Sequence, residues 1–233
     1  MSTFKFKQFE VNQTGCAMKV NTDGVLLGAT AWHSAPKRIL DIGTGTGVIA
    51  LMLAQRFAEA IIEAVEIDAA ASLTAGENFS KSKFNDRLLC QNIPIQEYNS
   101  ADRFDLIVSN PPFFVNDMKS GEVRKGIARH ADEDFFRMLV FQTEKLLAED
   151  GKLWLVLPVK RADEVVEAAK RVELNLVERI QIRSDRDKLP FRQMICLSRT
   201  QGNFRESYFD IYESMKQHTH QYKLLLRDFF LAF

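Results

Sequence analysis

Cysteine, net charge and long apolar runs are all scarce in this sequence of 233 residues. Its three cysteines, Cys16, Cys90 and Cys196, are odd in number and far apart, and no CxxC pair is present. This spacing argues against a disulfide framework and against a cysteine-based metal site. We therefore expect reduced thiols, no bound metal and a cytoplasmic location.

The charge balance argues against a protein that is drawn to nucleic acid or membranes by its overall charge, and the hydropathy pattern argues against a secreted or membrane-spanning protein. The 31 basic residues match 31 acidic residues, so no whole-molecule field directs the chain to nucleic acid or to a membrane. The opening MSTFKFKQFEV lacks the apolar core of a signal peptide, and no apolar run approaches the roughly 18 residues that span a bilayer. The composition, 46% apolar and 27% charged, is typical of a globular protein with an ample core. We expect a monomer without a membrane partner.

From residue 37 onward, short apolar segments alternate with segments of helical periodicity. The predicted strands are 38–42, 61–67, 87–91, 104–109 and 152–158, followed by a possible final pair, 174–182 and 192–199. The predicted helices are 46–60, 69–82, 134–150 and 161–172, and Gly151 is the expected stop of the third. The alternation predicts an α/β, Rossmann-like fold with a mostly parallel seven-stranded sheet and helices on both faces.

We expect one domain, with a Rossmann-like core over 37–200, an N-terminal segment over 1–36 and a C-terminal extension over 201–233. Such sheets bind ligands outside the carboxyl ends of their strands. Residues that directly follow a strand are therefore the first candidates for a functional site.

A glycine-rich stretch, LDIGTGTGVI at 40–49, joins the first core strand to the first helix. Its glycines allow a tight turn and a close backbone approach to a ligand, although a strand-to-helix turn alone can also need them. They are Gly43, Gly45 and Gly47. Val48 stands where a dinucleotide fingerprint has its last glycine. Asp41 would repel a pyrophosphate but suits an ammonium group, which favours S-adenosylmethionine over NAD as cofactor.

Polar residues end the next two strands as well. Glu66 follows Gly43 by 23 residues and could accept hydrogen bonds from both hydroxyls of a ribose, or could simply face water. Asn92 could hydrogen-bond the adenine of the cofactor while Ile93 packs on the ring, although asparagine is also a common turn residue. Asp68 is expected to cap the following helix.

The fourth strand runs into SNPPFF, residues 109–114. Pro111 and Pro112 stiffen the chain and provide no backbone N–H. The Asn110 side-chain oxygen and the Pro111 carbonyl could accept both hydrogens of an exocyclic amine and so aim its lone pair at a methyl donor. Phe113 would stack on the base that carries the amine. The alternative is a proline turn covered by core phenylalanines.

In this order, LDIGTGTG, VEID and NPPFF resemble the motifs of class I S-adenosylmethionine-dependent methyltransferases that act on amino groups. The stretches 4–31, 126–136 and 218–231 are similar to the bacterial tRNA1(Val) adenine methyltransferase family, so the resemblance reaches both ends of the chain. It implies methylation of the exocyclic amine of the adenine just 3′ of the anticodon. Asn21 and Asn92 depart from the family pattern, which more often has glycine and an acidic residue there.

The resemblance also implies that the N-terminal segment closes over the cofactor and substrate pocket. Thr22 and Asp23 could contact the ligand there, or could equally cap a helix over 24–33.

Two segments carry clustered basic residues that suit tRNA phosphates. The first is 119–130, within a stretch, 115–133, that is longer than a usual loop. The second is 179–205, which has seven basic residues and two acidic residues and therefore a net charge of +5. The alternative is a solvated strand-and-loop face.

Other functions use parts of the same pattern. A protein-glutamine N5-methyltransferase would hold a side-chain amide at the same NPP motif, but the basic segments and the terminal stretches favour RNA. A DNA adenine methyltransferase would be expected to carry an extra domain for reading duplex sequence. Asp41 and Val48 disfavour an NAD-linked oxidoreductase, and the presence of Asn110 disfavours a catalytically silent binding module.

Overall fold

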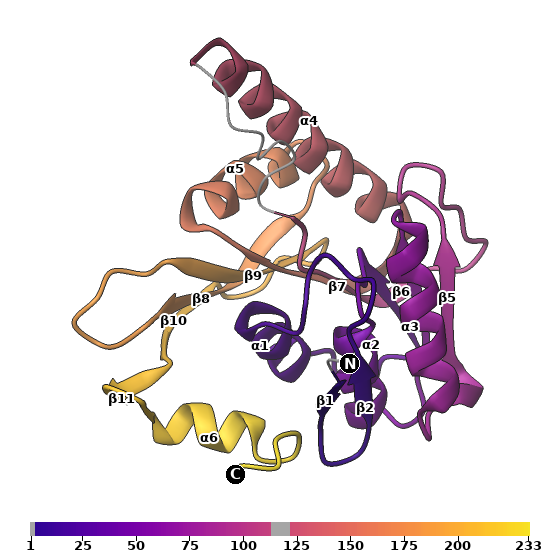
Figure 1. Ribbon diagram of the computed structural model, residues 1–233. Helices are drawn as coiled ribbons and strands as arrows, with labels where there is room; N and C mark the ends of the chain where they lie inside the picture. Colours follow the sequence, from indigo (N-terminus) through magenta and orange to yellow (C-terminus); the bar gives the residue numbers. More distant parts are fainter. Residues whose placement is uncertain (1–2, 113–121) are drawn as a thin grey trace.

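The computed structural model describes residues 3–112 and 122–233, with side chains described outside 113–133. Eight of its strands form one central sheet. They are β3 (Arg38–Ile42), β4 (Ile61–Glu66), β5 (Leu88–Asn92), β6 (Phe104–Ser109), β7 (Leu147–Leu157), β8 (Asn175–Arg183), β9 (Arg192–Ser198) and β10 (Arg205–Asp210). Their order across the sheet is β10-β8-β9-β7-β6-β3-β4-β5 (Figure 1).

Helices cover both faces of this sheet (Figure 1). One face carries α1 (Thr22–Thr30), α2 (Val48–Arg56), α3 (Ala69–Lys81) and α6 (His220–Leu226), and the other carries α4 (Glu122–Leu146) and α5 (Val159–Lys170). The smaller elements are the pair β1 (Thr3–Lys5) and β2 (Glu10–Asn12), the turn η1 (Asn85–Arg87), and the pair β11 (Tyr212–Ser214) and β12 (Gln217–His218). In the ranges that the structure describes, no helix is long and apolar enough to cross a membrane.

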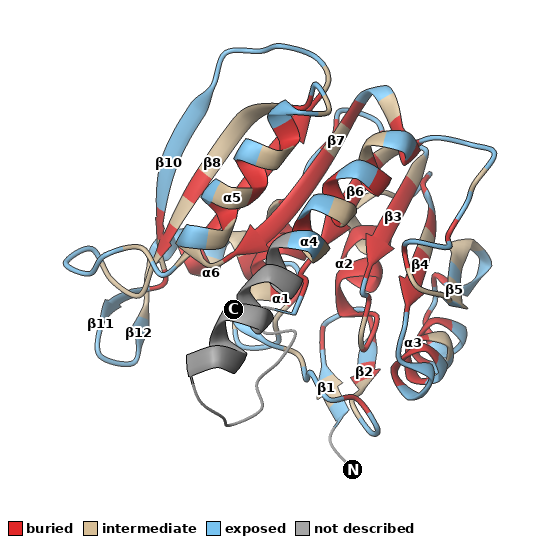
Figure 2. Ribbon diagram, turned by 90° about the horizontal axis from the view of Figure 1, so that it is seen from above, coloured by how far each residue is buried: buried red, intermediate tan, exposed pale blue. Residues whose placement is uncertain are grey.

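The predicted α/β fold with a mostly parallel sheet is confirmed, but the count of seven strands is wrong. Strand β9 runs antiparallel to β7 and β8, as the expected final pair requires, and β10 then adds an eighth strand parallel to β8. Only Phe209 of β10 is buried, so this edge strand is mostly pale blue in Figure 2, whereas the central strands are red. Its polar sequence gives no apolar alternation that would have predicted a strand.

The predicted helix over 134–150 is wrong at its C-terminal end. Helix α4 stops at Leu146, because Leu147 already pairs with Phe104 as the start of β7. Gly151 lies inside this strand near a register shift, and a Cβ there would lie 2.9 Å from the Phe104 carbonyl oxygen. The glycine therefore permits a close approach of two strands and does not end a helix. Helix α4 also begins at 122, so most of the expected loop 115–133 is helical.

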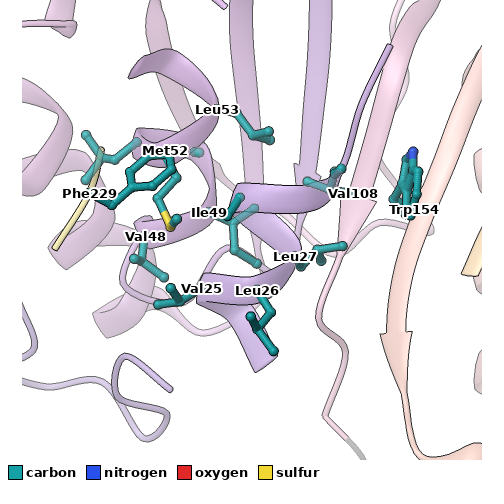
Figure 3. Close-up of a cluster of buried hydrophobic side chains, with 14 of the residues drawn as sticks. Val25, Leu26, Leu27, Val48, Ile49, Met52, Leu53, Val108, Trp154 and Phe229 are labelled. Carbon is teal, nitrogen blue, oxygen red and sulfur yellow. The ribbon is translucent and has the colours of Figure 1, made fainter. Parts of the chain in front are cut away.

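Helix α1 is packed into the core beside α2 and against β7. Six of its residues, 24–29, are buried. Figure 3 shows the side chains of Val25, Leu26 and Leu27 against Val48, Ile49 and Met52 of α2, with Phe229 on one side and Val108 and Trp154 on the other. The body of α1 is therefore fixed by apolar packing, and its first turn comes out at the carboxyl edge of the sheet.

The two ends of the described chain meet beside this core. Phe6 forms an isolated bridge with Phe230, and the rings of Phe4 and Phe6 lie within 5.8 Å of the Phe230 ring. Lys7 Nζ donates to the carbonyl oxygens of Arg227 and Phe233. These contacts anchor the N-terminal segment at one end.

Candidate active site

Four neighbouring strands bring the predicted site residues to one edge of the sheet. In the order β5-β4-β3-β6, their carboxyl ends carry Asn92, Glu66, the glycine loop and Asn110. The register pairs Glu66 with Asn92 and Ile42 with Ser109, so these ends lie side by side. The expectation that these residues meet at the carboxyl edge is confirmed.

The glycine loop adopts the backbone expected of it. Gly43, Gly45 and Gly47 all have positive φ, at 69°, 57° and 81°. At Gly47, where α2 begins, a Cβ would also lie 2.5 Å from the Phe79 ring, so no other residue fits without displacement. A Cβ at Gly43 or Gly45 would meet nothing within 4 Å, which leaves open space in front of the loop.

Glu66 is buried and holds this loop in place. Its Oε2 accepts a hydrogen bond from the Gly45 N–H at 2.9 Å, and its Oε1 accepts one from the Asp68 N–H at 3.0 Å. An ionised carboxylate has about four acceptor positions, so both oxygens can still accept from a ligand. Asp68 caps α3 by accepting from the Ala71 N–H at 2.8 Å, as predicted.

Asp41 is a buried carboxylate with an unused acceptor. Its Oδ2 accepts from the Thr44 hydroxyl at 2.6 Å, while its Oδ1 is buried and has no hydrogen-bond partner among the described residues. Burial raises the pKa of Asp41 to about 7, against the opposing effects of the Thr44 hydrogen bond and of the Ala50 backbone N–H. A cationic ligand group would supply the missing partner and favour the ionised form.

Asn92 uses its amide to hold the end of β4. Its Nδ2 donates to the carbonyl oxygens of Glu66 at 2.9 Å and Ile67 at 3.1 Å, and Ile93 is half-buried beside it. Ile67 has 71% of its surface exposed between these polar neighbours, and our sequence reasoning did not include it. An exposed apolar residue directly after a strand that ends in an acidic residue is the signal that could have marked it as a candidate ligand contact.

Asn110 is 8% exposed and is the second polar residue of the site with an unused acceptor. Its Oδ1 has no hydrogen-bond partner within the described ranges, and its Nδ2 lies 4.0 Å from Met18 Sδ. Pro111 is buried and Pro112 is exposed. Phe113, the predicted stacking residue, lies outside the described residues. The proline-stiffened turn thus holds an amide oxygen at the carboxyl edge, next to the strand that carries the glycine loop.

The first turn of α1 lies against Asn110, and its cap differs from the prediction. Asn21, not Thr22 or Asp23, caps the helix by accepting from the Gly24 N–H at 2.9 Å. Thr22 is exposed, while Asp23 forms an ion pair with Arg192 at 2.8 Å. A residue that differs from the family pattern thus takes the capping role.

Most of the basic residues over 179–205 are already paired. Their acidic partners come from other elements, which a count along the sequence cannot include. The pairs are Arg179–Asp163, Arg183–Asp210, Arg192–Asp23, Arg199–Glu144 and Arg205–Glu178. Arg186 and Lys188, in the turn between β8 and β9, are exposed and have no ion pair with a described residue. The side chains of the other basic segment, 119–130, lie outside the described residues.

The family model described as "Methyltransferase small domain" matches residues 17–174. A protein of Pedobacter heparinus is 49% identical over 232 residues, covering 100% of this chain and 99% of that protein. One of Dyadobacter fermentans is 40% identical, covering 99% and 98%. Both are named tRNA1(Val) (adenine(37)-N6)-methyltransferase.

Solved structures agree on the fold. A predicted O-methyltransferase from Agrobacterium tumefaciens superposes with a TM-score of 0.71 at 15% identity, covering 89% of this chain and 96% of that one. A ribosomal protein L11 methylase from Lactobacillus delbrueckii gives 0.58 at 18%, covering 81% and 83%. The family model covers well over half of the chain, and its relatives match it from end to end. The chain therefore belongs to the methyltransferase small domain family.

Proposed function

We propose that the protein transfers a methyl group from S-adenosylmethionine to the exocyclic N6 amine of an adenine in tRNA1(Val), at position 37 next to the anticodon. The observation that carries the proposal is the buried oxygen of Asn110, which has no hydrogen-bond partner among the described residues and lies directly before Pro111, beside the strand that ends in the glycine loop. The names of the full-length relatives support the choice of tRNA and of adenine.

The residues at the carboxyl edge fit the proposed cofactor. Asp41 has an unused buried oxygen for a cationic group, and the space in front of Gly43 and Gly45 is open. Glu66 would accept from the ribose hydroxyls, and Asn92 and Ile93 would contact the adenine. Thr22 would close the pocket from the N-terminal side, and Asp23, paired with Arg192, would hold that turn in place. When bound, S-adenosylmethionine supplies an electrophilic methyl group on a sulfonium.

The chemistry that this chain would contribute is orientation and charge stabilisation. Asn110 Oδ1 and the Pro111 carbonyl would each accept one hydrogen of the adenine amine. This arrangement takes the nitrogen lone pair out of conjugation with the ring and directs it toward the methyl group. The same two acceptors stabilise the positive charge that develops on nitrogen as the bond forms. Phe113 would stack on the base, and Pro112 would keep the turn rigid.

The tRNA contacts follow from the charges that remain unpaired. Arg186 and Lys188 are the candidates for phosphate contacts within 179–205, and the segment 119–130 is the second candidate surface. We place the enzyme in the cytoplasm with its substrate, as a monomer built from one methyltransferase domain. The extension 201–233 contributes β10 to the main sheet and so continues the core.

The test is methyl transfer from labelled S-adenosylmethionine to tRNA that lacks the modification, followed by digestion and identification of the nucleoside. We expect N6-methyladenosine from tRNA1(Val), and none when its adenine 37 is replaced by guanine. DNA and glutamine-containing peptides serve as competing substrates. Label in a glutamine side chain, or no label in adenine, would show that the proposed substrate is wrong.

A further inference from the structure

The orientation of the Asn110 amide depends on the N-terminal segment. Among the described residues, its one side-chain hydrogen bond is from Nδ2 to Met18 Sδ at 4.0 Å, and a thioether is a weak acceptor. A Cβ at Gly24 would lie 3.6 Å from the same Nδ2, so the first turn of α1 forms the wall beside the amide. If this turn moves, nothing else described holds the Asn110 oxygen in its present direction.

The chain on either side of this turn is well anchored. Before it, Asn78 Nδ2 donates to the Asn12 carbonyl oxygen and the Thr74 hydroxyl donates to the Thr14 carbonyl oxygen, both at 2.9 Å. After it, the body of α1 is buried against α2 (Figure 3). The intervening segment is mostly exposed, with Met18 at 41%, although the Val20 N–H donates to Gln13 Oε1 at 2.8 Å. In the first turn Thr22 is exposed and Asp23 is partly buried, and this turn has an additional anchor to the sheet.

The ion pair between Asp23 and Arg192 is that anchor. Asp23 Oδ2 accepts from Arg192 Nε at 2.8 Å, and the two side chains are 14% and 26% exposed. Arg192 is the first residue of β9 and pairs with Ile182 of β8, so its backbone is fixed in the sheet. Partial burial weakens the screening of this pair by salt.

We propose that the Asp23–Arg192 ion pair is a positioning latch for methyl transfer, a role that rests on the proposed function of Asn110. The pair fixes the first turn of α1, this turn fixes the Asn110 amide, and the amide fixes the target amine. Both are positioning residues, because they act through Asn110. The latch therefore affects the rate of transfer more than the affinity for the cofactor, which binds at the other strand ends.

A double-mutant cycle tests this pair. We expect Asp23→Asn and Arg192→Gln each to lower kcat about tenfold at saturating tRNA, with S-adenosylhomocysteine affinity changed less than about twofold. Residues that act through one contact are not additive, so the double variant should also lose about tenfold. The control is Glu144→Gln, which breaks the 2.7 Å pair with Arg199 at the other end of β9 and should leave kcat unchanged.

A loss near a hundredfold in the double variant would overturn the latch, because the two residues would then act independently. A parallel fall in cofactor affinity in Asp23→Asn would also overturn it and would favour direct contact between Asp23 and the cofactor.

A second measurement does not depend on activity. The side-chain amide resonance of Asn110, assigned by its loss in Asn110→Ala, should shift or broaden in Asp23→Asn and remain unchanged in Glu144→Gln. An unchanged resonance in Asp23→Asn would refute the latch even if the wild-type enzyme methylates tRNA. A shifted resonance in a protein that transfers no methyl group to tRNA would support the latch and refute the proposed substrate.

Discussion

The two halves of the candidate site are held together over very different distances along the chain. On the cofactor side, Thr44 donates a hydrogen bond to Asp41, three residues away, and Gly45 donates one to Glu66, 21 residues away. On the amine side, Asn110 contacts Met18 across 92 residues, and Asp23 reaches Arg192 across 169. The first half is built within neighbouring β-α units. The second half needs contributions from both ends of the chain, so the two halves should fail in different ways.

The largest expected effect separates the two halves directly. Asn110→Ala should lower turnover by roughly 10²-fold or more, the scale of losing one hydrogen-bond partner in a transition state. Cofactor affinity, measured by calorimetry, should stay within about twofold, because the proposed cofactor contacts come from Asp41, the glycine loop, Glu66 and Asn92. Asn175→Ala, the same truncation at the opposite edge of the sheet, is the control. Near-normal turnover in Asn110→Ala would show that Asn110 does not orient the amine.

The next largest effect comes from substitutions that change the cofactor side alone. Glu66→Ala or Asp41→Ala should weaken S-adenosylmethionine binding by about 1–3 kcal/mol, the scale of a lost charge-assisted hydrogen bond. Glu66→Ala also removes the acceptor for two backbone N–H groups, so the loop itself should loosen. Glu97→Ala, an exposed carboxylate, is the control. Unchanged calorimetric affinity in both variants would show that the cofactor binds elsewhere.

The pH dependence of binding sharpens the assignment of Asp41. Its pKa, raised to about 7, means that cofactor affinity should rise as pH increases through 7, because the cationic ligand binds the ionised carboxylate. Between pH 6 and 8 the affinity should rise about tenfold, because the ionised fraction of a carboxyl with this pKa rises about tenfold over the same range. Asp41→Asn should abolish this dependence. A flat profile in the wild type would contradict a contact between Asp41 and a cation.

Folding stability should show the opposite sign for the same group. A carboxyl whose pKa is higher in the folded state than in the unfolded chain stabilises the fold at low pH. For Asp41 this contribution is complete below about pH 4 and is lost as pH rises through 7. Asn stays neutral like the protonated carboxyl, so wild type and Asp41→Asn should be similarly stable near pH 4, and denaturant unfolding should show the wild type falling below the variant as pH rises through 7.

The smallest expected effect concerns the tRNA surface. Arg186→Ala combined with Lys188→Ala should reduce tRNA affinity by less than about tenfold and flatten the slope of log affinity against log salt by roughly 1.5, somewhat under one unit per phosphate contact. The matched control is Lys37→Ala with Arg103→Ala, two exposed basic residues at the amino edge of the sheet. Equal slopes for the two double variants would show that the RNA contacts lie elsewhere, with 119–130 as the next candidate.

The positions of the residues on the proposed cofactor side are predictable from the sequence because their signals are local. A strand, a glycine turn and a helix follow one another over 38–56, and the polar residues that matter directly follow strands. The rule that parallel strands present their carboxyl ends at one edge then brings Asp41, Glu66, Asn92 and Asn110 together without any further information. The exact N-cap residue of a helix is less predictable, because Asn21 and Thr22 are adjacent in the sequence and both residue types cap helices.

The other half depends on pairings that no local pattern encodes. Strand β10 is held by Arg205 to Glu178 and by Arg183 to Asp210, and it has a single buried apolar residue, Phe209. Gly151 lies in a strand because Phe104, 47 residues earlier in sequence, comes close to it. The apparent positive charge over 179–205 is largely cancelled for the same reason, since each partner of an arginine lies on a different element.

The meeting of the chain ends has a consequence for the order in which the enzyme matures on the ribosome. Strands β3 to β5 and the glycine loop are synthesised early and can form before the rest of the sheet exists. The bridge between Phe6 and Phe230, and the bond from Lys7 to the Phe233 carbonyl across 226 residues, cannot form until the last of these residues has left the exit tunnel. These two contacts of the N-terminal segment are therefore added late in translation, after its bonds from Thr74 and Asn78. A nascent chain would hold a cofactor pocket before it could position a substrate amine.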